Sequence, residues 1–334
     1  MAEHITLWNG KTIPRIGIGT WVMGGEMYWG TAPVGWSNVS DSGSLEALSA
    51  AFDMGVRLID SADIYGGGHS ESIVGQAMAA SDVPRDEFVV ATKFGMAFEG
   101  RQIDGEHVTL DAIRRACEAS AKRLGVDRID LYQFHLDDYE IEAAKSVFEA
   151  LQTIRQEGMI DTFGWSTNAP ASGAAFSHMD DFVGVQHDMN IFRRADDSLA
   201  ATAEGDVLSI IRQPLAMGLL SGKYDASKVT FGDGDIRTGG AGWMIYFDED
   251  GQPVPALLDM MEQLRAIISE DGRSLAQGAL AWVLAAAPNT LPIPGCRNEK
   301  QVRDNMGVIE QGPLTQDQMA RIDSVMKDMP PMAA

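Results

Sequence analysis

Residues 57–93 read RLIDSADIYGGGHSESIVGQAMAASDVPRDEFVVATK. Two short apolar runs, Arg57–Asp60 and Phe88–Lys93, have the length of buried strands, and Glu71–Ala80 between them has the pattern of a helix. A strand, a helix and a second strand in this order are typical of a parallel βαβ unit. This segment therefore predicts a parallel sheet covered by helices.

The same alternation continues on both sides of this segment. About eight strand–helix units without a break predict a closed (β/α)8 TIM barrel rather than an open sheet, with residues 1–334 as a single domain. The further predicted elements, in chain order, are Arg15–Trp21, Leu45–Met54, Leu110–Leu124, Arg128–His135, Glu142–Gln156, Ile160–Ser166, Ala171–His178, Phe182–Gln186, Val207–Arg212, Ala256–Ile268, Ser274–Ala285, Leu291–Ile293 and Glu299–Ile309.

Three further segments shape the two ends of the predicted barrel. Residues 5–13 have the pattern of a β-hairpin on a two-residue Asn9-Gly10 turn, which is expected to cap one end of the barrel. Val22–Ser44 and Pro214–Pro255 are long, aromatic-rich connections, and we expect them to form pocket walls or lids at the C-terminal face. The candidates for the substrate pocket are Trp21, Trp29 and Trp243.

Composition excludes several classes of partner. The chain has 48 acidic and 26 basic residues, a net charge of −22, which should repel nucleic acid and anionic lipid.

The sequence has no apolar run long enough for a membrane span and no secretory signal pattern. Its two cysteines lack metal or redox spacing. The six histidines also lack ligand spacing, so no metal is expected. We expect a cytoplasmic monomer or small homo-oligomer acting on a small molecule.

Chemically useful side chains recur at the carboxyl ends of the predicted strands. Asp60, Lys93 and His135 each end a strand, and Tyr65 lies in the loop after Asp60. These ends meet at one face of a parallel barrel, where active sites lie. An ammonium near a phenol lowers its pKa, and Asp60 could hold Lys93 charged. Together with His135, the group could protonate a developing alkoxide, as carbonyl reduction requires.

Each of these residues also has a simpler explanation. Asp60 could cap a turn, and Tyr65 could be a packing aromatic residue. Lys93 could be a solvated strand end, and His135 a structural histidine. The catalytic hypothesis depends on four suitable residue types at matching positions.

Three blocks of this sequence resemble the aldo-keto reductase superfamily. They are Leu58–Gly66 followed by Ser70-Glu71, then Ala91–Lys93, then Tyr132–His135, and they occur in the family's order. The resemblance extends from the N-terminal hairpin to about Asn305. It implies a reductase that uses NADPH on an aldehyde or ketone, possibly a sugar. It also implies Asp60, Tyr65, Lys93 and His135 as a catalytic tetrad, with Tyr65 as the general acid.

The cofactor site is also assigned by resemblance, because no Gly-x-Gly-x-x-Gly motif opens a helix after the first strand. Ser166 and Gln186 could supply the donor and acceptor that a nicotinamide carboxamide needs. Thr167 stands where the family has Asn, and Asn168 could compensate or cap the next helix. Arg212 stands where the family commonly has an aromatic residue on the nicotinamide, and a planar guanidinium can stack as well.

Two later segments resemble the parts of the family that hold the rest of the cofactor. Residues 214–223 look like its pyrophosphate loop, with Gly218 allowing close backbone approach. Arg297 is the candidate cation for the 2′-phosphate, although it could be an idle surface residue. The candidates in these two segments are Pro214, Leu215, Met217, Gly218, Lys223, Gly295, Arg297, Gln301 and Asn305.

Two other functions are compatible with parts of this pattern. Lys93 at a barrel strand end could form a Schiff base with a carbonyl substrate, as in barrel aldolases. Alternatively, the barrel could bind NADPH as a redox-sensing regulatory module with little turnover. The cofactor-like segments argue against the first alternative, and the intact tetrad argues against the second.

Overall fold

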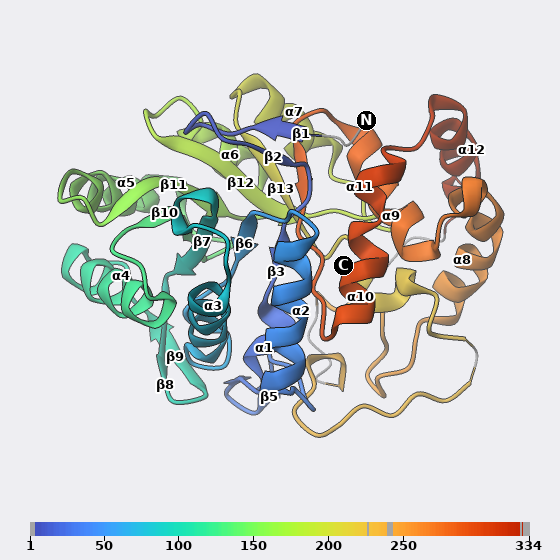
Figure 1. The fold of residues 1–334 in the computed structure, drawn as a ribbon, viewed down its shortest axis with the longest axis horizontal. Coiled ribbons are helices and arrows are strands. Elements are labelled where there is room, and N and C mark those ends of the chain that lie inside the picture. Colours follow the sequence, from blue (N-terminus) through green and yellow to red (C-terminus); the bar gives the residue numbers. More distant parts are fainter. Residues whose placement is uncertain (1–3, 226, 239–242, 328, 330–334) are drawn as a thin grey trace.

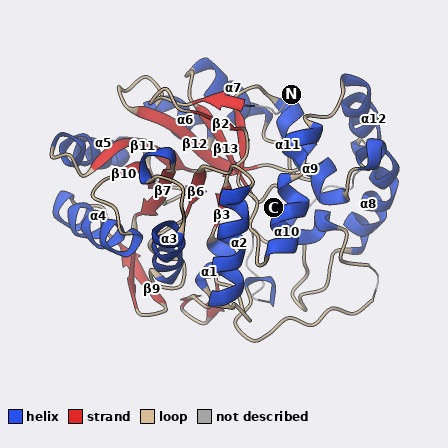
Figure 2. Cartoon of the chain, viewed as in Figure 1, coloured by secondary structure: helices blue, strands red, loops and turns tan. Residues whose placement is uncertain are grey.

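The computed structural model describes residues 4–225, 227–238, 243–327 and 329. Its central sheet has eight parallel strands in the order β14-β13-β12-β11-β10-β7-β6-β3, surrounded by helices (Figures 1 and 2). The predicted (β/α)8 barrel is therefore confirmed. The strands are β3 (Ile18–Gly19), β6 (Leu58–Asp60), β7 (Val89–Phe94), β10 (Ile129–Phe134), β11 (Ile160–Ser166), β12 (Phe182–Asp188), β13 (Leu208–Arg212) and β14 (Thr290–Pro292).

The barrel closes between its first and last strands. The backbone N–H of Gly17 donates to the carbonyl of Pro292 at 2.9 Å, and that of Gly19 donates to Pro294 at 3.2 Å. A Cβ on Gly19 would lie only 2.7 Å from the Ile293 carbonyl oxygen, so this close approach requires glycine. The first strand is shorter than the predicted Arg15–Trp21, because Trp21 already begins the short helix α1 (Trp21–Gly24).

An N-terminal hairpin covers the end of the barrel opposite to the long loops (Figure 1). It consists of β1 (His4–Thr6) and β2 (Thr12–Pro14). The connection between the two strands has five residues, 7–11, rather than the two expected. Within it the N–H of Leu7 bonds to the Lys11 carbonyl, and Gly10 takes a φ of +78°. Leu7 and Ile13 pack with apolar residues of the strands inside the barrel. The predicted cap is therefore present.

We expect Ile13→Ala to lower the free energy of unfolding by about 2–4 kcal/mol, because Ile13 is 2% exposed and its loss leaves a cavity among the barrel residues. Urea unfolding followed by circular dichroism measures this change. Thr6→Ala on the exposed side of the same hairpin is the control and should cost less than about 0.5 kcal/mol. Equal losses in the two variants would contradict a packed cap.

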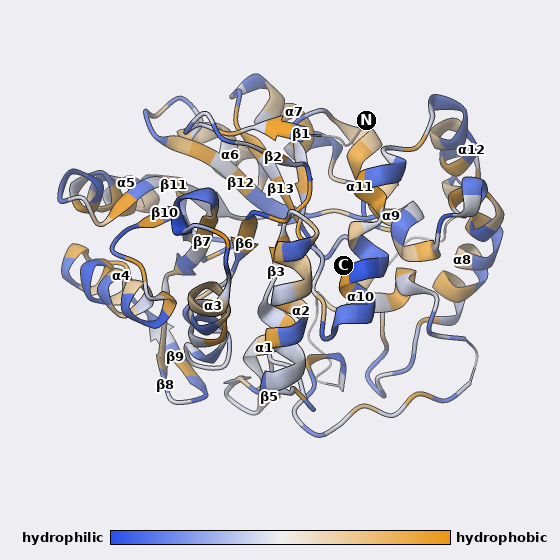
Figure 3. Ribbon diagram, in the orientation of Figure 1, coloured by the Kyte–Doolittle hydropathy of each residue, from blue (hydrophilic) through white to orange (hydrophobic). Residues whose placement is uncertain are grey.

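The helices bury one side in the core. In α4 the residues Ile113, Cys117 and Leu124 are buried, and hydrophilic residues lie on its outer side (Figure 3). Among the described residues, no helix is both long enough and apolar enough to cross a membrane. The helices around the barrel are α2 (Asp41–Asp53), α3 (His69–Ala80), α4 (Leu110–Leu124), α5 (Ile141–Gln156), α6 (Pro170–Phe176), α7 (Asp196–Glu204), α8 (Pro255–Ile268), α9 (Leu275–Ala286), α10 (Glu299–Met306), α11 (Val308–Gln311) and α12 (Gln316–Met326).

Several elements differ from the sequence-based expectation. Helix α2 begins four residues earlier than predicted, because the Ser40 side chain caps it by accepting from the Gly43 N–H. The predicted helix Glu299–Ile309 is divided at Gly307 into α10 and α11. The elements that the sequence pattern missed are α7, α12 and a small sheet made of β4 (Tyr28–Trp29), β5 (Ala32–Pro33), β8 (Met96–Glu99) and β9 (Gln102–Glu106).

Candidate active site

Three of the four predicted tetrad residues are joined by direct contacts. The Lys93 ammonium donates to the Asp60 carboxylate at 2.6 Å and to the Tyr65 hydroxyl at 3.1 Å. Lys93 is fully buried, so these contacts are shielded from water. The His135 ring lies almost perpendicular to the Tyr65 ring, with centroids 6.1 Å apart. The expected convergence of these four residues, from three strand ends and one loop, is therefore observed.

Asp60 holds this group in place through contacts with other strands. Its second carboxylate oxygen accepts from the side-chain amides of Gln133 at 3.1 Å and Gln186 at 2.8 Å. Asp60, Lys93, Gln133 and Gln186 come from β6, β7, β10 and β12. Four barrel strands thus fix the orientation of the ammonium that faces Tyr65.

The environment shifts the pKa values of Tyr65 and His135 in opposite directions. Burial raises the pKa of the Tyr65 hydroxyl above its ordinary 10.0, and the nearby Lys93 charge offsets only part of this rise. The expectation that the ammonium lowers this pKa is therefore wrong for the net effect. Burial and the charges of Lys93 and Arg212 lower the pKa of His135 well below its usual range. Tyr65 accordingly holds its proton at neutral pH, and His135 is an uncharged imidazole.

The loop that carries Tyr65 is fixed by its glycines and by Glu71. Gly66, Gly67 and Gly68 all have positive φ, and a Cβ on Gly66 would lie 1.8 Å from the Gly24 carbonyl oxygen. The fully buried Glu71 accepts from the Thr92 hydroxyl at 2.5 Å and from Arg123 at 2.6 Å. These contacts anchor the loop to β7 and α4, so the Tyr65 hydroxyl stays beside Lys93.

A cavity of about 540 Å³ opens above these residues. It brings together most of the side chains that the sequence singled out. Two predicted residues do not line the cavity: Lys93 is fully buried behind its contacts with Asp60 and Tyr65, and the Thr167 hydroxyl donates to the Asp137 carbonyl at 2.9 Å. The predicted residues that do line the cavity are Asp60, Tyr65, His135, Ser166, Gln186, Arg212, Pro214, Leu215, Met217, Gly218, Lys223, Gly295, Arg297, Gln301, Asn305, Trp21, Trp29 and Trp243.

Arg212 is held by ion pairs that the sequence did not reveal. Its guanidinium donates to Asp188 at 2.6 Å, to the Ser166 hydroxyl at 2.8 Å and to Asp137 at 3.0 Å. Asn168 donates to both of these carboxylates and does not cap α6, whose N-cap is Ala169. The guanidinium is therefore fixed in orientation against the cavity wall.

Ser166 and Gln186 keep hydrogen-bonding capacity on the cavity side. The Ser166 oxygen accepts from Arg212, which leaves its hydroxyl proton to donate elsewhere. The Gln186 amide nitrogen donates to Asp60 and Gln133, while within the described chain its Oε1 has no partner. One donor and one acceptor thus remain beside Tyr65, which is the pair that a carboxamide requires.

The opposite end of the cavity is rich in cations. Arg297 stacks over the Trp36 ring at 5.1 Å and lies 3.8 Å from Asp235. Arg237 lies over the same ring at 4.8 Å and forms a bidentate pair with Asp235. Burial, with the charges of Arg237 and Arg297, lowers the pKa of Lys223 to about 8. Arg297 is therefore not an idle surface residue but part of a cluster of three cations.

The neighbours of Arg297 have partners of their own. Gln301 accepts from the backbone N–H of Arg297 at 2.8 Å. The Asn305 amide donates to the buried Cys296 sulfur at 3.2 Å, which supports a packing role for that cysteine. Asn298 caps α10 by accepting from the Gln301 N–H. Gln301 and Asn305 thus shape this wall in addition to lining it.

The sequence interpretation missed several residues of the cavity. Asp137 and Asp188 each lie two residues after a predicted site residue at a strand end, so the strand-end pattern could have found them. Arg237 lies in the long loop Pro214–Pro255, where no periodic pattern marks it. Met96 and Ile103 line the cavity from the unpredicted β8–β9 hairpin.

Comparisons with known proteins agree with this fold. The aldo/keto reductase family model matches residues 15–327. Aldo-keto reductase YhdN of Bacillus subtilis is 28% identical over 88% of this chain and 84% of its own. The NADH-specific methylglyoxal reductase of Escherichia coli is 26% identical over 89% of this chain and 90% of its own.

Solved structures show the same similarity. A glycerol dehydrogenase from Gluconobacter oxydans has a TM-score of 0.81 and 27% identity, covering 98% of this chain and 96% of its own. An aldo-keto reductase from Klebsiella pneumoniae in complex with NADPH shares the fold, with a TM-score of 0.68, 23% identity and coverage of 99% and 96%. These matches define an oxidoreductase of the barrel class. The chain belongs to the aldo/keto reductase family.

Proposed function

We propose that this protein reduces an aldehyde or ketone to the alcohol with NADPH, and that Tyr65 is the general acid. The observation that carries the proposal is the Tyr65 hydroxyl at 3.1 Å from a fully buried Lys93 that is itself paired with Asp60. A hydroxyl so placed can give its proton to the carbonyl oxygen as negative charge develops there. The neutral His135 can donate a hydrogen bond to the same oxygen.

The cavity residues fit a nicotinamide cofactor. When bound, NADPH supplies the hydride for the reduction. The Ser166 hydroxyl and the Gln186 Oε1 offer the donor and acceptor for its carboxamide, and Arg212 offers a flat surface held by Asp137 and Asp188. The aromatic walls around the cavity exclude water from the reacting groups.

The cation cluster near Trp36 supports the choice of NADPH over NADH. A 2′-phosphate is disfavoured by a chain with a net charge of −22 unless cations meet it locally. Arg237 is occupied by Asp235 and Tyr224, whereas Arg297 makes only a 3.8 Å approach to Asp235. Arg297 therefore keeps guanidinium donors available to a phosphate.

We expect Arg297→Ala to weaken NADPH binding by roughly 10–100-fold and to leave NADH binding nearly unchanged, because one charge-assisted contact is lost. Titration of both cofactors by protein fluorescence measures this. Arg303→Ala, which removes an exposed arginine paired with Glu299 in the same region, is the matched control and should change neither affinity. An equal loss for both cofactors, or none, would show that Arg297 does not contact the 2′-phosphate.

The two alternative functions are less well supported. A Schiff-base lysine must lose its proton. Burial lowers the pKa of Lys93, but the charge of Asp60 and the hydrogen bonds with Asp60 and Tyr65 outweigh this effect and raise that pKa above its ordinary 10.5. A regulatory module with little turnover needs no ordered proton donor, whereas here four strands hold one in place.

The test of the proposed function is NADPH oxidation at 340 nm across a panel of aldehydes, ketones and sugars. Steady turnover with at least one class is expected. Tight NADPH binding without turnover would favour the regulatory alternative, and trapping of a substrate adduct by borohydride would favour the Schiff base.

A further inference from the structure

Among the described residues, none at the cavity end near Tyr65 offers an unpaired cation to an anionic substrate. Lys93 is engaged by Asp60 and Tyr65, and the Arg212 guanidinium by Asp137, Asp188 and Ser166. The other described cations of the cavity wall, Lys223, Arg237 and Arg297, belong to the cluster near Trp36. A substrate carboxylate would therefore lose its hydration here without gaining a counter-ion.

The same end of the cavity has an extended apolar wall. Trp21 lies almost parallel to the Tyr65 ring, with centroids 6.0 Å apart, and Trp243 lies 6.3 Å from Trp21. Trp29 is 56% exposed, which is unusual for so large an apolar side chain. Such a wall fits an aromatic or apolar substrate body.

The wall continues into a second groove outside the cavity. Trp29 and Ile103 line both, and they are cross-strand neighbours in β4 and β9. The remaining groove lining comprises Gly30, Glu99, Gln102, Asp104 and Gly105. A molecule that is bound in the cavity and extends past Trp29 would therefore place its far end in the groove, away from the catalytic residues and near the carboxylates of Glu99 and Asp104. The adjacent Arg101 is paired with Glu26 at 3.1 Å and does not line the groove.

We propose that the substrate is an elongated carbonyl compound with an aromatic or apolar body and a positively charged far end, which crosses Trp29 into this groove. This inference rests on the proposed carbonyl reduction. The Trp29 face attracts a cation through its ring electrons, and Glu99 and Asp104 complement its charge. Anionic tails are disfavoured by the same groups and by the exposed Asp138 at the cavity rim.

Three benzaldehydes with para-alkoxy tails of equal length test the proposal. Their tails end in a methyl group, a trimethylammonium group or a carboxylate. With NADPH at low ionic strength, we expect kcat/KM in the order ammonium, methyl, carboxylate, with the first and last differing roughly tenfold, and a smaller ratio at high salt. Equal values, or a preference for the carboxylate, would overturn the proposal. If none of the three is reduced while other carbonyl compounds also fail, the proposed function itself fails instead.

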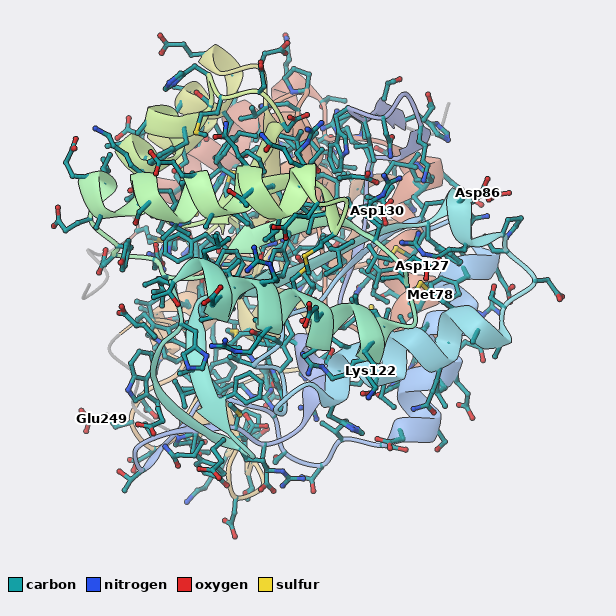
Figure 4. The ribbon with its side chains drawn as sticks, turned by 90° about the vertical axis from the view of Figure 1, so that its left-hand side faces the viewer. Met78, Asp86, Lys122, Asp127, Asp130 and Glu249 are labelled. Atoms are coloured by element: carbon teal, nitrogen blue, oxygen red, sulfur yellow. The ribbon has the colours of Figure 1, made fainter. Side chains whose placement is uncertain are left out.

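Charge variants separate a local groove effect from the overall charge. The double variant Glu99→Gln with Asp104→Asn removes both groove carboxylates. In this variant the ratio of kcat/KM for the ammonium probe to kcat/KM for the carboxylate probe should fall to about threefold or less, because neither charged tail then has a charged partner in the groove. Asp86→Asn with Asp127→Asn changes the net charge equally and should keep the wild-type ratio. These two residues precede the amino ends of β7 and β10, whereas the β8–β9 hairpin with the groove follows the carboxyl end of β7, and both lie on the side away from Glu249 in Figure 4. Trp29→Ala should lower kcat/KM for the ammonium probe more than for untailed benzaldehyde. The same ratio in both double variants would overturn the groove assignment.

Discussion

Replacing Tyr65 by Phe is expected to lower the turnover of carbonyl reduction by about 10²–10⁴-fold. The substitution removes the proton that we assign to the carbonyl oxygen and keeps the ring. That ring retains its stacking against Trp21 and its position 4.9 Å from the Lys93 ammonium. The loss should therefore appear in kcat, whereas the affinity for NADPH should change little.

Single-turnover reduction and fluorescence titration of NADPH measure the two quantities. Tyr139→Phe removes a hydroxyl outside the cavity lining and is the matched control, with turnover close to the wild-type value. Because the pKa of Tyr65 is raised, the wild-type hydroxyl stays protonated as the pH rises through neutrality, so the difference should persist up to about pH 9. Near-full turnover in Tyr65→Phe would refute its role as the proton donor.

Lys93→Met is expected to abolish most of the turnover, again by at least about 10²-fold, and Asp60→Asn to reduce it less. Without the ammonium, the main opposition to the effect of burial on the Tyr65 pKa is lost, because only the charge of Arg212 still lowers it, and the proton becomes harder to give away. An Asn at position 60 keeps one oxygen for Lys93, and Gln133 and Gln186 can rotate their amides toward the new side chain.

The Lys93 variant also leaves Asp60 buried without its counter-ion, which should cost about 3–5 kcal/mol of stability. Circular dichroism and NADPH titration at low temperature therefore accompany the kinetics, so that loss of chemistry is measured on folded protein. A variant that folds, binds NADPH and reduces its substrate at the wild-type rate would contradict the role of Lys93. A larger loss in Asp60→Asn than in Lys93→Met would reverse the assigned order.

The barrel and the meeting of Asp60, Tyr65, Lys93 and His135 could be predicted from sequence because both follow from local patterns. The periodicity of strands and helices can be recognised within short segments of sequence. Parallel strands bring their carboxyl ends to one face of the barrel, and this does not depend on the conformation of the loops. The small sheet around Trp29 could not be predicted, since its two-residue strands have no periodicity and depend on pairing with β9.

The hydrogen-bond and ion-pair partners of individual side chains could also not be predicted from the sequence. Arg212 could have stacked or paired, and only the fold shows that Asp137 and Asp188 lie within reach of its guanidinium. The net pKa shift of Tyr65 depends on the balance of burial against the charges of Lys93, Asp60 and Arg212, and the depth of burial is known only once the loop is folded. The role of Arg237 in the cavity could not be predicted either, because it depends on the fold of the long loop that places its guanidinium over the Trp36 ring.

The junction of β3 with β14 has a consequence for how ligand binding affects unfolding. Trp36 follows the first strand, Arg297 follows the last, and the two side chains stack across the line where the barrel closes. A dinucleotide bound there would contact residues that follow both the first strand, β3, and the last strand, β14, and so would bridge the line where the barrel closes. It would bind the closed barrel and not an opened one. Raising its free concentration should therefore raise the free energy of unfolding by mass action, without any new contact within the protein.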